Sequence, residues 1–333
     1  MERFRASYEI IDESYKINIS SMSEGTQIKY KKGDYYYKVD SLGNEGLVEV
    51  LCSLICQYAK INHAQYWLSV INGKKGCKSK DFLKSGEKII TFASLYKYRT
   101  GRDLNSDLVN CNSPDERYNL VVNFTKDLPF IKSYLQKIMS LDFLILNEDR
   151  HLRNLAVISG TSGIRECTIF DNGNSLLTCN ISVNRYDTPE SAVKKVCSKP
   201  FSGSPNKQLK LVGGNCLSID YVGLLLELEN LKENYREVEI LKYQLQHYRS
   251  MYWKRKLYSL YHNGKCIGTR IFSKSGDTIL KYDTRIVLKN CGNLSRLNMV
   301  KKGNIYIVEG DGDDIKEVIL SNEILNILGL EYV

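Results

Sequence analysis

The stretch NEDRHLRNLAVI, residues 147 to 158, places Asp149, His151 and Asn154 directly before an apolar run that is typical of a buried strand. A second acidic residue, Asp171, follows the strand-like run TIF and precedes Gly173. Phosphoryl transfer needs a carboxylate that orients the attacking hydroxyl, and carboxylate or amide oxygens that hold magnesium. In protein kinases an Asn follows the catalytic Asp by five residues, and a metal-binding Asp comes later, before a Gly. This chain has the same spacing.

Each of these two polar stretches also has a simpler, structural interpretation. Asp149, His151 and Asn154 could form a polar helix cap or turn, although a cap needs one such side chain and not three. Asp171, Asn172 and Gly173 could be a turn without a further role. The chemical interpretation therefore depends on other parts of the chain.

Residues upstream supply the remaining parts of a phosphate-binding site. Lys38 lies in the strand-like run YYYKV, and Glu49 lies on the predicted helix that follows, with Glu45 one turn earlier as an alternative partner for the lysine. Gly25, in SMSEGTQIK, is predicted to lie in a turn between two strands, where backbone N–H groups can face a phosphate. Each residue alone is a weak sign. Their order along the chain favours a nucleotide-dependent phosphotransferase.

These residues resemble the HipA-like family of bacterial serine/threonine kinases, and more narrowly its compact CtkA-like members. NEDRHLRN at 147–154 is similar to the family's NxDRHxxN catalytic loop, and GTQIK at 25–29 is similar to its GxQxK phosphate loop. The form DRHxxN also occurs in phosphatidylinositol kinases, whereas kinases of eukaryotic type use HRDxxxxN. The resemblance covers about residues 19 to 245.

The resemblance implies ATP and Mg²⁺ as ligands and assigns roles to single residues. Asp149 would be the catalytic base, and Asn154 and Asp171 would be the Mg²⁺ ligands. Arg150 is expected to pair with either a carboxylate or a phosphate, and His151 to be structural, with a hydrogen bond to the loop backbone. The ATP-binding residues would be Gly25, Thr26, Gln27, Lys38, Glu49 and Glu45.

The chain departs from the family pattern in two places. Ser21 and Ser23 lie near the phosphate loop, but not in register with the serines whose autophosphorylation inactivates the best-known members. A β-rich segment from about Leu257 has no counterpart in the compact kinases. Its expected roles are docking of a protein substrate, binding of an antitoxin-like or regulatory partner, or binding of nucleic acid. The resemblance also suggests a toxin-like enzyme that acts on a translation factor, or an effector that is delivered to a host cell.

The net charge of +9 is concentrated in one segment. Residues 250–302 contain twelve Lys or Arg and two Asp, whereas residues 303–333 contain seven acidic residues and one Lys. Such a basic segment can attract nucleic acid or an acidic protein. The alternative is a solvated face whose charge the acidic tail offsets.

Length and composition place the chain among ordinary globular proteins. A chain of 333 residues can form two or three modest cores. The ten cysteines show no CxxC spacing, which favours reduced, structural thiols. Apolar runs fall short of the roughly 18 residues of a membrane span, and the first residues lack the apolar centre of a signal peptide. We therefore expect a cytoplasmic protein, and the resemblance implies that it is bacterial.

Periodicity predicts an α+β protein with an appended β-rich unit, and the resemblance implies that the rest has a two-lobed, protein-kinase-like fold. Residues 8–40 are predicted to form a small antiparallel sheet with a turn at Gly33, and Asn44 to cap a helix over residues 45–59. YWLSVI is predicted to be a strand before a polar loop, and ECTIF another strand. The hinge is expected near residues 98–104. Further predicted segments are helices at 113–128 and 129–146, a long loop at 176–205, helix at 221–258, later strands, and a short helix around Ile324.

The predicted domains are an N-lobe at 1–98, a C-lobe at 99–256 and a C-terminal domain at 257–333. ATP is expected to bind between the lobes. Two other functions remain open: a lipid or small-molecule kinase of the same fold, and a nucleotide-binding pseudokinase that binds a partner through its basic C-terminal unit.

Overall fold

The computed structural model describes residues 2–17, 27–184, 186–229, 231 and 233–248, and the backbone of strands between residues 256 and 332. The chain divides into two compact units. The first comprises Met1–Leu217 and Tyr235–Leu241, and the second comprises Ser218–Asn234 and Lys242–Val333. The predicted α+β class is confirmed, with a β-rich N-terminal part, a helical part and a β-rich C-terminal part. The lobe boundaries at residues 98 and 256 stay predictions.

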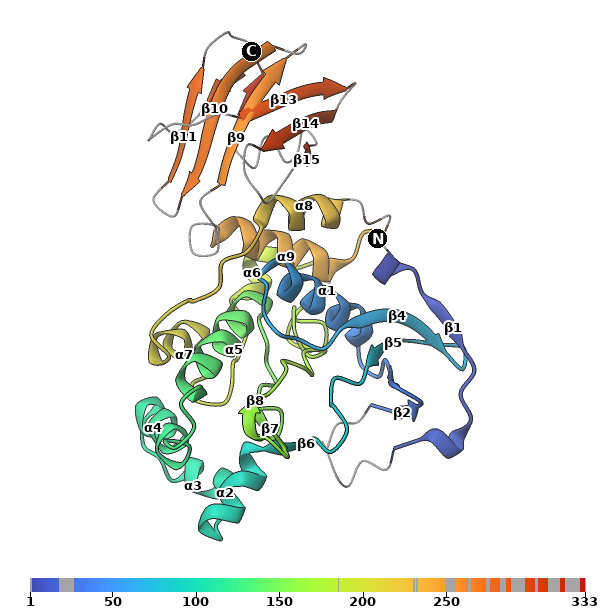
Figure 1. The fold of residues 1–333 in the computed structure, drawn as a ribbon, viewed down its shortest axis with the longest axis vertical. Coiled ribbons are helices and arrows are strands. Elements are labelled where there is room, and N and C mark those ends of the chain that lie inside the picture. Colours follow the sequence, from blue (N-terminus) through green and yellow to red (C-terminus); the bar gives the residue numbers. More distant parts are fainter. Residues whose placement is uncertain are drawn as a thin grey trace. The chain divides into compact units, whose positions relative to one another are not determined.

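The N-terminal part of the first unit is a five-stranded sheet (Figure 1). Its strands are β1 (Ser7–Glu9), β2 (Lys29–Lys32), β3 (Tyr35–Val39), β4 (Tyr66–Ile71) and β5 (Lys74–Lys80). The order is β1-β4-β5-β3-β2, with β1 and β4 parallel and the other neighbours antiparallel. Short 3-10 turns, η1 (Glu2–Phe4) and η2 (Glu13–Tyr15), flank β1. The predicted turn at Gly33 joins β2 to β3, and its φ of 59° suits a residue without a side chain.

The prediction of a purely antiparallel sheet confined to residues 8–40 was wrong. Strand β5, which we expected to be a polar loop, lies in the middle of the sheet, between β4 and β3. Gly76 permits this packing, because a Cβ there would lie 2.1 Å from the Lys38 carbonyl oxygen. Pairing on both sides fixes this strand in spite of its lysines, which propensity alone would place in a loop.

Helix α1 (Glu45–Tyr58) packs against β4 and β5, as its apolar spacing of three and four residues predicts. Asn44 occupies the N-cap position, but its side chain makes no capping hydrogen bond. Instead, the Glu45 carboxylate accepts hydrogen bonds from the backbone N–H groups of Ser41, Leu42 and Gly43 at 2.8–3.2 Å. Asp40, just after β3, accepts the Gly46 N–H at 2.7 Å.

A second, three-stranded sheet follows the first in the chain. Its strands are β6 (Lys88–Thr91), β7 (Ala156–Gly160) and β8 (Gly163–Glu166), all antiparallel. The chain therefore passes between the two sheets at residues 81–87, and the segment 98–104, where we expected the hinge, instead separates two helices. Of the strand predicted at ECTIF, Glu166 is the last residue of β8 and Ile169 forms an isolated bridge with His63.

The helical part contains most of the core of the first unit. Its helices are α2 (Phe92–Thr100), α3 (Leu104–Val109), α4 (Pro114–Phe124), α5 (Ile131–Ile145), α6 (Pro189–Val193) and α7 (Pro205–Leu211). Helix α5 is almost wholly buried and ends at Leu146, whose φ of 54° turns the chain into the NEDRHLRN stretch. The predicted long loop at 176–205 contains α6, so it is partly helical.

The predicted helix at 221–258 is two helices, α8 (Tyr221–Glu229) and α9 (Arg236–His247). The second unit then continues in a sheet with the order β11-β10-β9-β14-β13, in which β15 also pairs with β14, and in a β12-β16 pair. These strands are β9 (Lys256–His262), β10 (Lys265–Ser273), β11 (Gly276–Lys281), β12 (Ile286–Leu288), β13 (Leu297–Lys302), β14 (Ile305–Gly310), β15 (Val318–Leu320) and β16 (Leu330–Tyr332). The helix predicted around Ile324 and the side chains of the basic segment lie outside the described residues.

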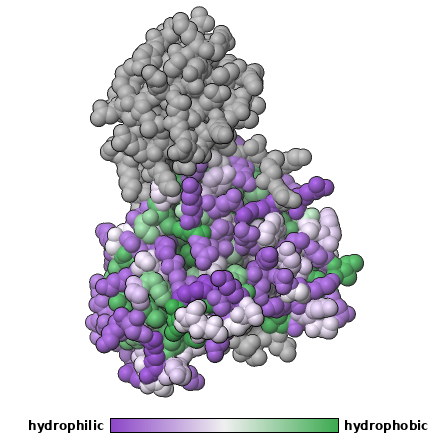
Figure 2. Space-filling model, in the orientation of Figure 1, coloured by the Kyte–Doolittle hydropathy of each residue, from purple (hydrophilic) through white to green (hydrophobic). Residues whose placement is uncertain are grey.

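None of the described helices combines the length and apolar character that a membrane crossing requires. On the face shown in Figure 2, hydrophilic side chains prevail over the described part, and apolar ones gather in a few places.

Asp40 provides a test of this packing through the pH dependence of stability. Burial raises the pKa of Asp40 from 3.8 to about 6. Since the folded chain then holds this proton more tightly than the unfolded chain does, the contribution of Asp40 to the free energy of unfolding falls as pH rises from about 4 to about 6. We expect Asp40→Asn, which keeps an acceptor for Gly46, to raise the free energy of unfolding by about 1 kcal/mol at pH 7.5.

Urea unfolding, followed by circular dichroism at pH 7.5 and pH 4, measures this effect. The gain should be much smaller at pH 4, where the wild-type carboxyl is protonated in the folded chain and partly protonated in the unfolded chain. Asp34→Asn, at an exposed turn position, is the matched control and should change stability equally little at both pH values. An Asp40→Asn variant without a pH-dependent gain would contradict the prediction.

Candidate active site

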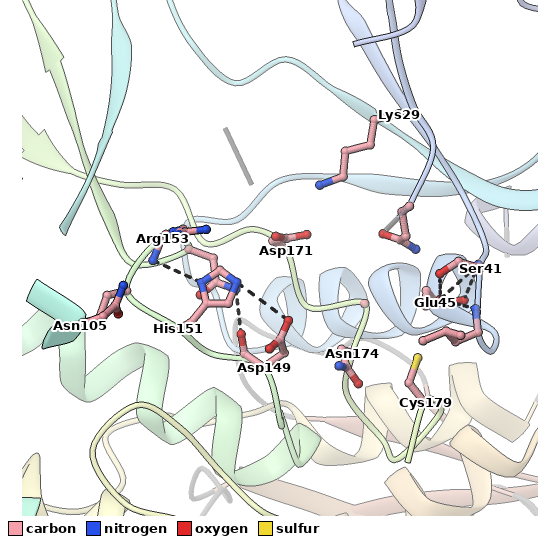
Figure 3. A pocket seen from close by; sticks show the side chains of 15 residues that line it. Lys29, Ser41, Glu45, Asn105, Asp149, His151, Arg153, Asp171, Asn174 and Cys179 are labelled. Atoms are coloured by element: carbon pink, nitrogen blue, oxygen red, sulfur yellow. Dashed lines mark hydrogen bonds and ion pairs between the residues drawn. The ribbon is translucent and has the colours of Figure 1, made fainter. Parts of the chain in front are cut away.

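A cavity of about 430 Å³ collects most of the predicted site residues (Figure 3). All of its lining residues belong to the first unit. The predicted residues that line it are Gln27, Glu45, Asp149, His151, Asn154 and Asp171. Lys38 lies behind this lining and contacts it through Asp171, and Glu49 binds Lys38 and the backbone N–H of Asn172. Gly25 and Thr26, together with Ser21 and Ser23, lie outside the described residues.

The loop after α5 is shaped by hydrogen bonds between its own residues. The Asn147 side-chain oxygen accepts the Asp149 N–H at 2.9 Å, and the Asn154 side-chain amide donates to the Asp149 carbonyl at 3.0 Å. This second bond fixes the orientation of the Asn154 amide. Asn154 Oδ1 is buried and has no hydrogen-bond partner among the residues that the structure describes. A buried, unpaired oxygen is costly, so this atom is suited to a cation ligand role.

Arg150 connects this loop to the rest of the site. Its side chain is 1% exposed and makes two 2.9 Å hydrogen bonds to the Asp142 carboxylate on α5. It also donates to the Phe170 carbonyl at 3.2 Å and to Asn172 Oδ1 at 2.6 Å. Of the two partners that the sequence left open, a carboxylate or a phosphate, the structure gives the carboxylate. Arg150 therefore joins α5, the NEDRHLRN loop and the residues on both sides of Asp171.

His151 bonds to the loop backbone. Its Nδ1 accepts the Arg153 N–H at 3.2 Å, and its Nε2 lies 3.9 Å from an Asp149 carboxylate oxygen. Burial lowers the pKa of His151, although Asp149 and Asp171 act in the opposite direction. The imidazole is therefore neutral near pH 7, with its proton on Nε2 because Nδ1 is an acceptor.

Asp171 is held in an uncommon backbone conformation, with φ of 60°. Burial would raise the pKa of Asp171, but Lys38, Lys29 and Arg150 together bring it well below its ordinary value. The carboxylate is therefore ionised across the physiological range. Lys38 Nζ lies 2.7 Å from its Oδ1.

Lys38 pairs with Glu49, and Glu45 has another role. The Lys38 ammonium lies 2.5 Å from Glu49 Oε1, and the other Glu49 oxygen accepts the Asn172 N–H at 3.0 Å. Burial would lower the pKa of Lys38, but Asp171 and Glu49 raise it well above its ordinary value. The lysine is therefore charged. Glu45, one helical turn earlier, lines the cavity and instead accepts hydrogen bonds from the backbone N–H groups of residues 41–43, just before α1.

Lys29 also lines the cavity, although the prediction did not assign it a role. It lies directly opposite Lys38 in the β2–β3 register, so both side chains project from the same face of the sheet. Burial lowers the pKa of Lys29, and the Asp171 carboxylate opposes this effect. The sequence could have indicated Lys29 as a site residue, because it is the last residue of the GTQIK motif.

Two further residues of the cavity had no signal in the sequence. Asn105 comes from α3, and Cys179 comes from the segment after Asp171. Burial, followed by the charge of Glu45, raises the pKa of Cys179 to about 12, so this group is a thiol at neutral pH. Only tertiary packing brings these residues to the cavity.

The oxygens of Asn154 and Asp171 fit a magnesium ion better than a transition metal. Among the described residues, no group of three His, Cys, Asp or Glu side chains could hold a metal. Magnesium is usually bound by one or two carboxylates together with water and substrate phosphates. One ionised carboxylate and one unpaired amide oxygen match this donor set.

Comparison with known proteins gives similarities of structure only. No family model and no curated protein matches the chain. Among solved structures, it is similar to the proinflammatory kinase CtkA of Helicobacter pylori, with 15% identity and a TM-score of 0.48, over 73% of this chain and 95% of that chain. It is also similar to a chain of the HipA, HipB and operator DNA complex, a toxin-antitoxin system of Shewanella oneidensis MR-1. That match has 13% identity and a TM-score of 0.36, and covers 70% of this chain and 64% of that chain.

The Arg150 network predicts a large effect on stability. We expect Arg150→Met to lower the free energy of unfolding by about 3–5 kcal/mol, because it leaves the buried Asp142 carboxylate without its cation. The double variant Arg150→Met/Asp142→Leu should recover part of this loss, since it removes the unpaired charge. Urea unfolding at pH 7.5 measures both.

Arg165→Met is the matched control. Arg165 makes a similar two-bond pair with Glu87, at 2.7 and 2.9 Å, but its side chain is 38% exposed. We expect this variant to cost less than about 1 kcal/mol. Equal losses in the free energy of unfolding for the two variants would show that burial of the Arg150–Asp142 pair does not determine its contribution to stability.

Proposed function

We propose that the chain is an ATP- and Mg²⁺-dependent serine/threonine protein kinase of the HipA and CtkA type. One observation carries the proposal: Asp149, Asn154 and Asp171 line a single cavity, beside the ion pair that Lys38 of β3 makes with Glu49 of α1. A strand lysine paired with a helix glutamate next to the metal-binding Asp is the arrangement that protein kinases require for activity.

In this proposal the charged groups act in distinct ways. Asp149, whose side chain is 42% exposed, accepts the proton of the substrate hydroxyl. Asn154 and Asp171 hold Mg²⁺, which would neutralise negative charge on the ATP phosphates. Lys29 and Lys38 provide positive charge on the β2–β3 face of the cavity. Gln27 lines the same cavity and, with Gly25 and Thr26, belongs to the proposed phosphate loop.

The finer parts of the proposal concern substrates and partners. The acceptor would be a Ser or Thr hydroxyl of a protein, and autophosphorylation at Ser21 or Ser23 is part of the proposal. A toxin or effector role, and an antitoxin-like or regulatory partner, extend it. They are supported by the resemblance of NEDRHLRN and GTQIK to the family motifs. Binding of nucleic acid by residues 250–302 would follow from charge alone.

Transfer of labelled phosphate tests the proposed activity. We expect the full chain with Mg²⁺ and labelled ATP to label itself or a generic protein acceptor, and Asp149→Asn and Asp171→Asn to reduce the rate by about 10²-fold or more. Asp115→Asn, at an exposed position of α4, is the matched control and should keep the wild-type rate. Circular dichroism establishes that each variant is folded.

The outcomes separate the proposal from its alternatives. A wild-type chain that binds Mg·ATP but labels neither itself nor any protein would favour the pseudokinase function. Transfer to phosphoinositide and not to protein would favour a lipid kinase. Transfer that survives in Asp149→Asn would place the base elsewhere.

The two glutamates of α1 should differ in their effects. We expect Glu49→Gln to weaken binding of Mg·ATP by about 10-fold, because it removes the charge that positions Lys38. Glu45→Gln should have a smaller effect on binding and should instead lower thermal stability, because the Glu45 carboxylate caps residues 41–43. Calorimetric titration and thermal unfolding measure the two effects. A larger loss of Mg·ATP binding in Glu45→Gln than in Glu49→Gln would mean that Glu45, and not Glu49, positions Lys38 for the ATP phosphates.

A further inference from the structure

The segment after Asp171 returns to the NEDRHLRN loop at two consecutive residues. Glu148 accepts the backbone N–H of Cys197 at 3.1 Å and the side-chain amide of Asn180 at 2.8 Å. Next to it, the ammonium of Lys199 lies 3.2 Å from Oδ1 of Asp149. A cation from outside both sequence motifs therefore reaches the carboxylate that we assign as the base.

The backbone on both sides of Lys199 is fixed by a packed turn. Ser198 donates from its N–H to the Gly203 carbonyl at 3.1 Å, and from its hydroxyl to the Ser202 carbonyl at 2.9 Å. Phe201 is fully buried, and its N–H donates to Gln208 Oε1 at 3.1 Å. The Lys199 side chain, by contrast, is 55% exposed. A rigid turn thus presents a solvated ammonium group at Asp149.

Stability does not explain this position. The side chains of both partners are largely exposed, at 55% and 42%, and such pairs contribute little to the free energy of unfolding. A cation at this place has a chemical use, however. An acceptor hydroxyl that gives its proton to Asp149 must lie next to the phosphorus atom that it attacks, so the oxygens of that phosphoryl group come within reach of an ammonium at Asp149.

We propose that Lys199 is a further catalytic residue, which binds the transferred phosphoryl group beside Asp149. This inference rests on the proposed kinase function. In the transfer, the acceptor oxygen bonds to the γ-phosphorus and its proton passes to Asp149. The bond from that phosphorus to the bridging oxygen breaks, and its electron pair leaves with ADP. Lys199 gains and loses no proton; it contributes positive charge beside Asp149.

Nucleotide binding tests this role without the need for a known acceptor. Calorimetric titration of the full chain compares Mg·ADP with the Mg²⁺ complex of a nonhydrolysable ATP analogue that has an imido bridge. We expect Lys199→Met to weaken binding of the analogue by about 10-fold and to leave Mg·ADP binding within about 2-fold of wild type, because only the analogue has a γ-phosphoryl group. Lys199→Arg, which keeps the charge, should recover most of the loss.

Lys194→Met is the matched control. Lys194 lies in the same segment and pairs with Glu190 at 3.0 Å, with a side chain that is 69% exposed. It should bind both nucleotides as the wild type does. Where phosphate transfer is measurable, Lys199→Met should lower kcat more than it raises KM for ATP.

Two results would overturn the inference while the proposed function stands. Equal binding of the analogue by wild type and Lys199→Met would show that the lysine does not contact the γ-phosphoryl group. Tighter binding or faster transfer in Lys199→Met would show that Lys199 instead obstructs the site. A wild-type chain that binds neither nucleotide would overturn the proposed function itself.

Discussion

The buried pair of Arg150 and Asp142 is the interaction on which the rest of the site depends. Two charges removed from water are tolerable only when their hydrogen bonds are complete, and the guanidinium achieves this with Asp142, the Phe170 carbonyl and Asn172. These partners lie on α5 and on both sides of Asp171. A single side chain therefore fixes the distance between the loop that contains Asp149 and the turn that contains Asp171.

A second ionic group, Lys38 with Glu49 and Asp171, connects the five-stranded sheet to the same turn. Glu49 is 1% exposed and uses one oxygen for Lys38 and the other for the Asn172 N–H. Asn172 thus contacts Arg150 through its side chain and Glu49 through its backbone. The conformation of Asp171, with its positive φ, is maintained because its neighbours on both sides are held by buried charges.

The cavity that results combines fixed charge with one unsatisfied oxygen. Lys29 faces it from the sheet, with Lys38 behind the lining, and the ionised Asp171 and Oδ1 of Asn154 face it from the loops. An anionic ligand that brings a hard cation satisfies all of these groups at once. This complementarity supports the proposed binding of a nucleoside triphosphate with magnesium more directly than any one residue does.

The sequence by itself determined the local features: the spacing of Asp149 and Asn154, the helix at Glu45 and the hairpin at Gly33, because each depends on residues a few positions apart. It left open whether Glu45 or Glu49 pairs with Lys38, since both lie on one face of a helix. It also missed the places of β5 in the sheet, of Lys29 at the cavity and of Lys199 beside Asp149. Strand pairing places β5 and Lys29, and a turn about fifty residues beyond Asp149 places Lys199. Only the tertiary structure could decide these, because their contacts join segments that are far apart in the chain.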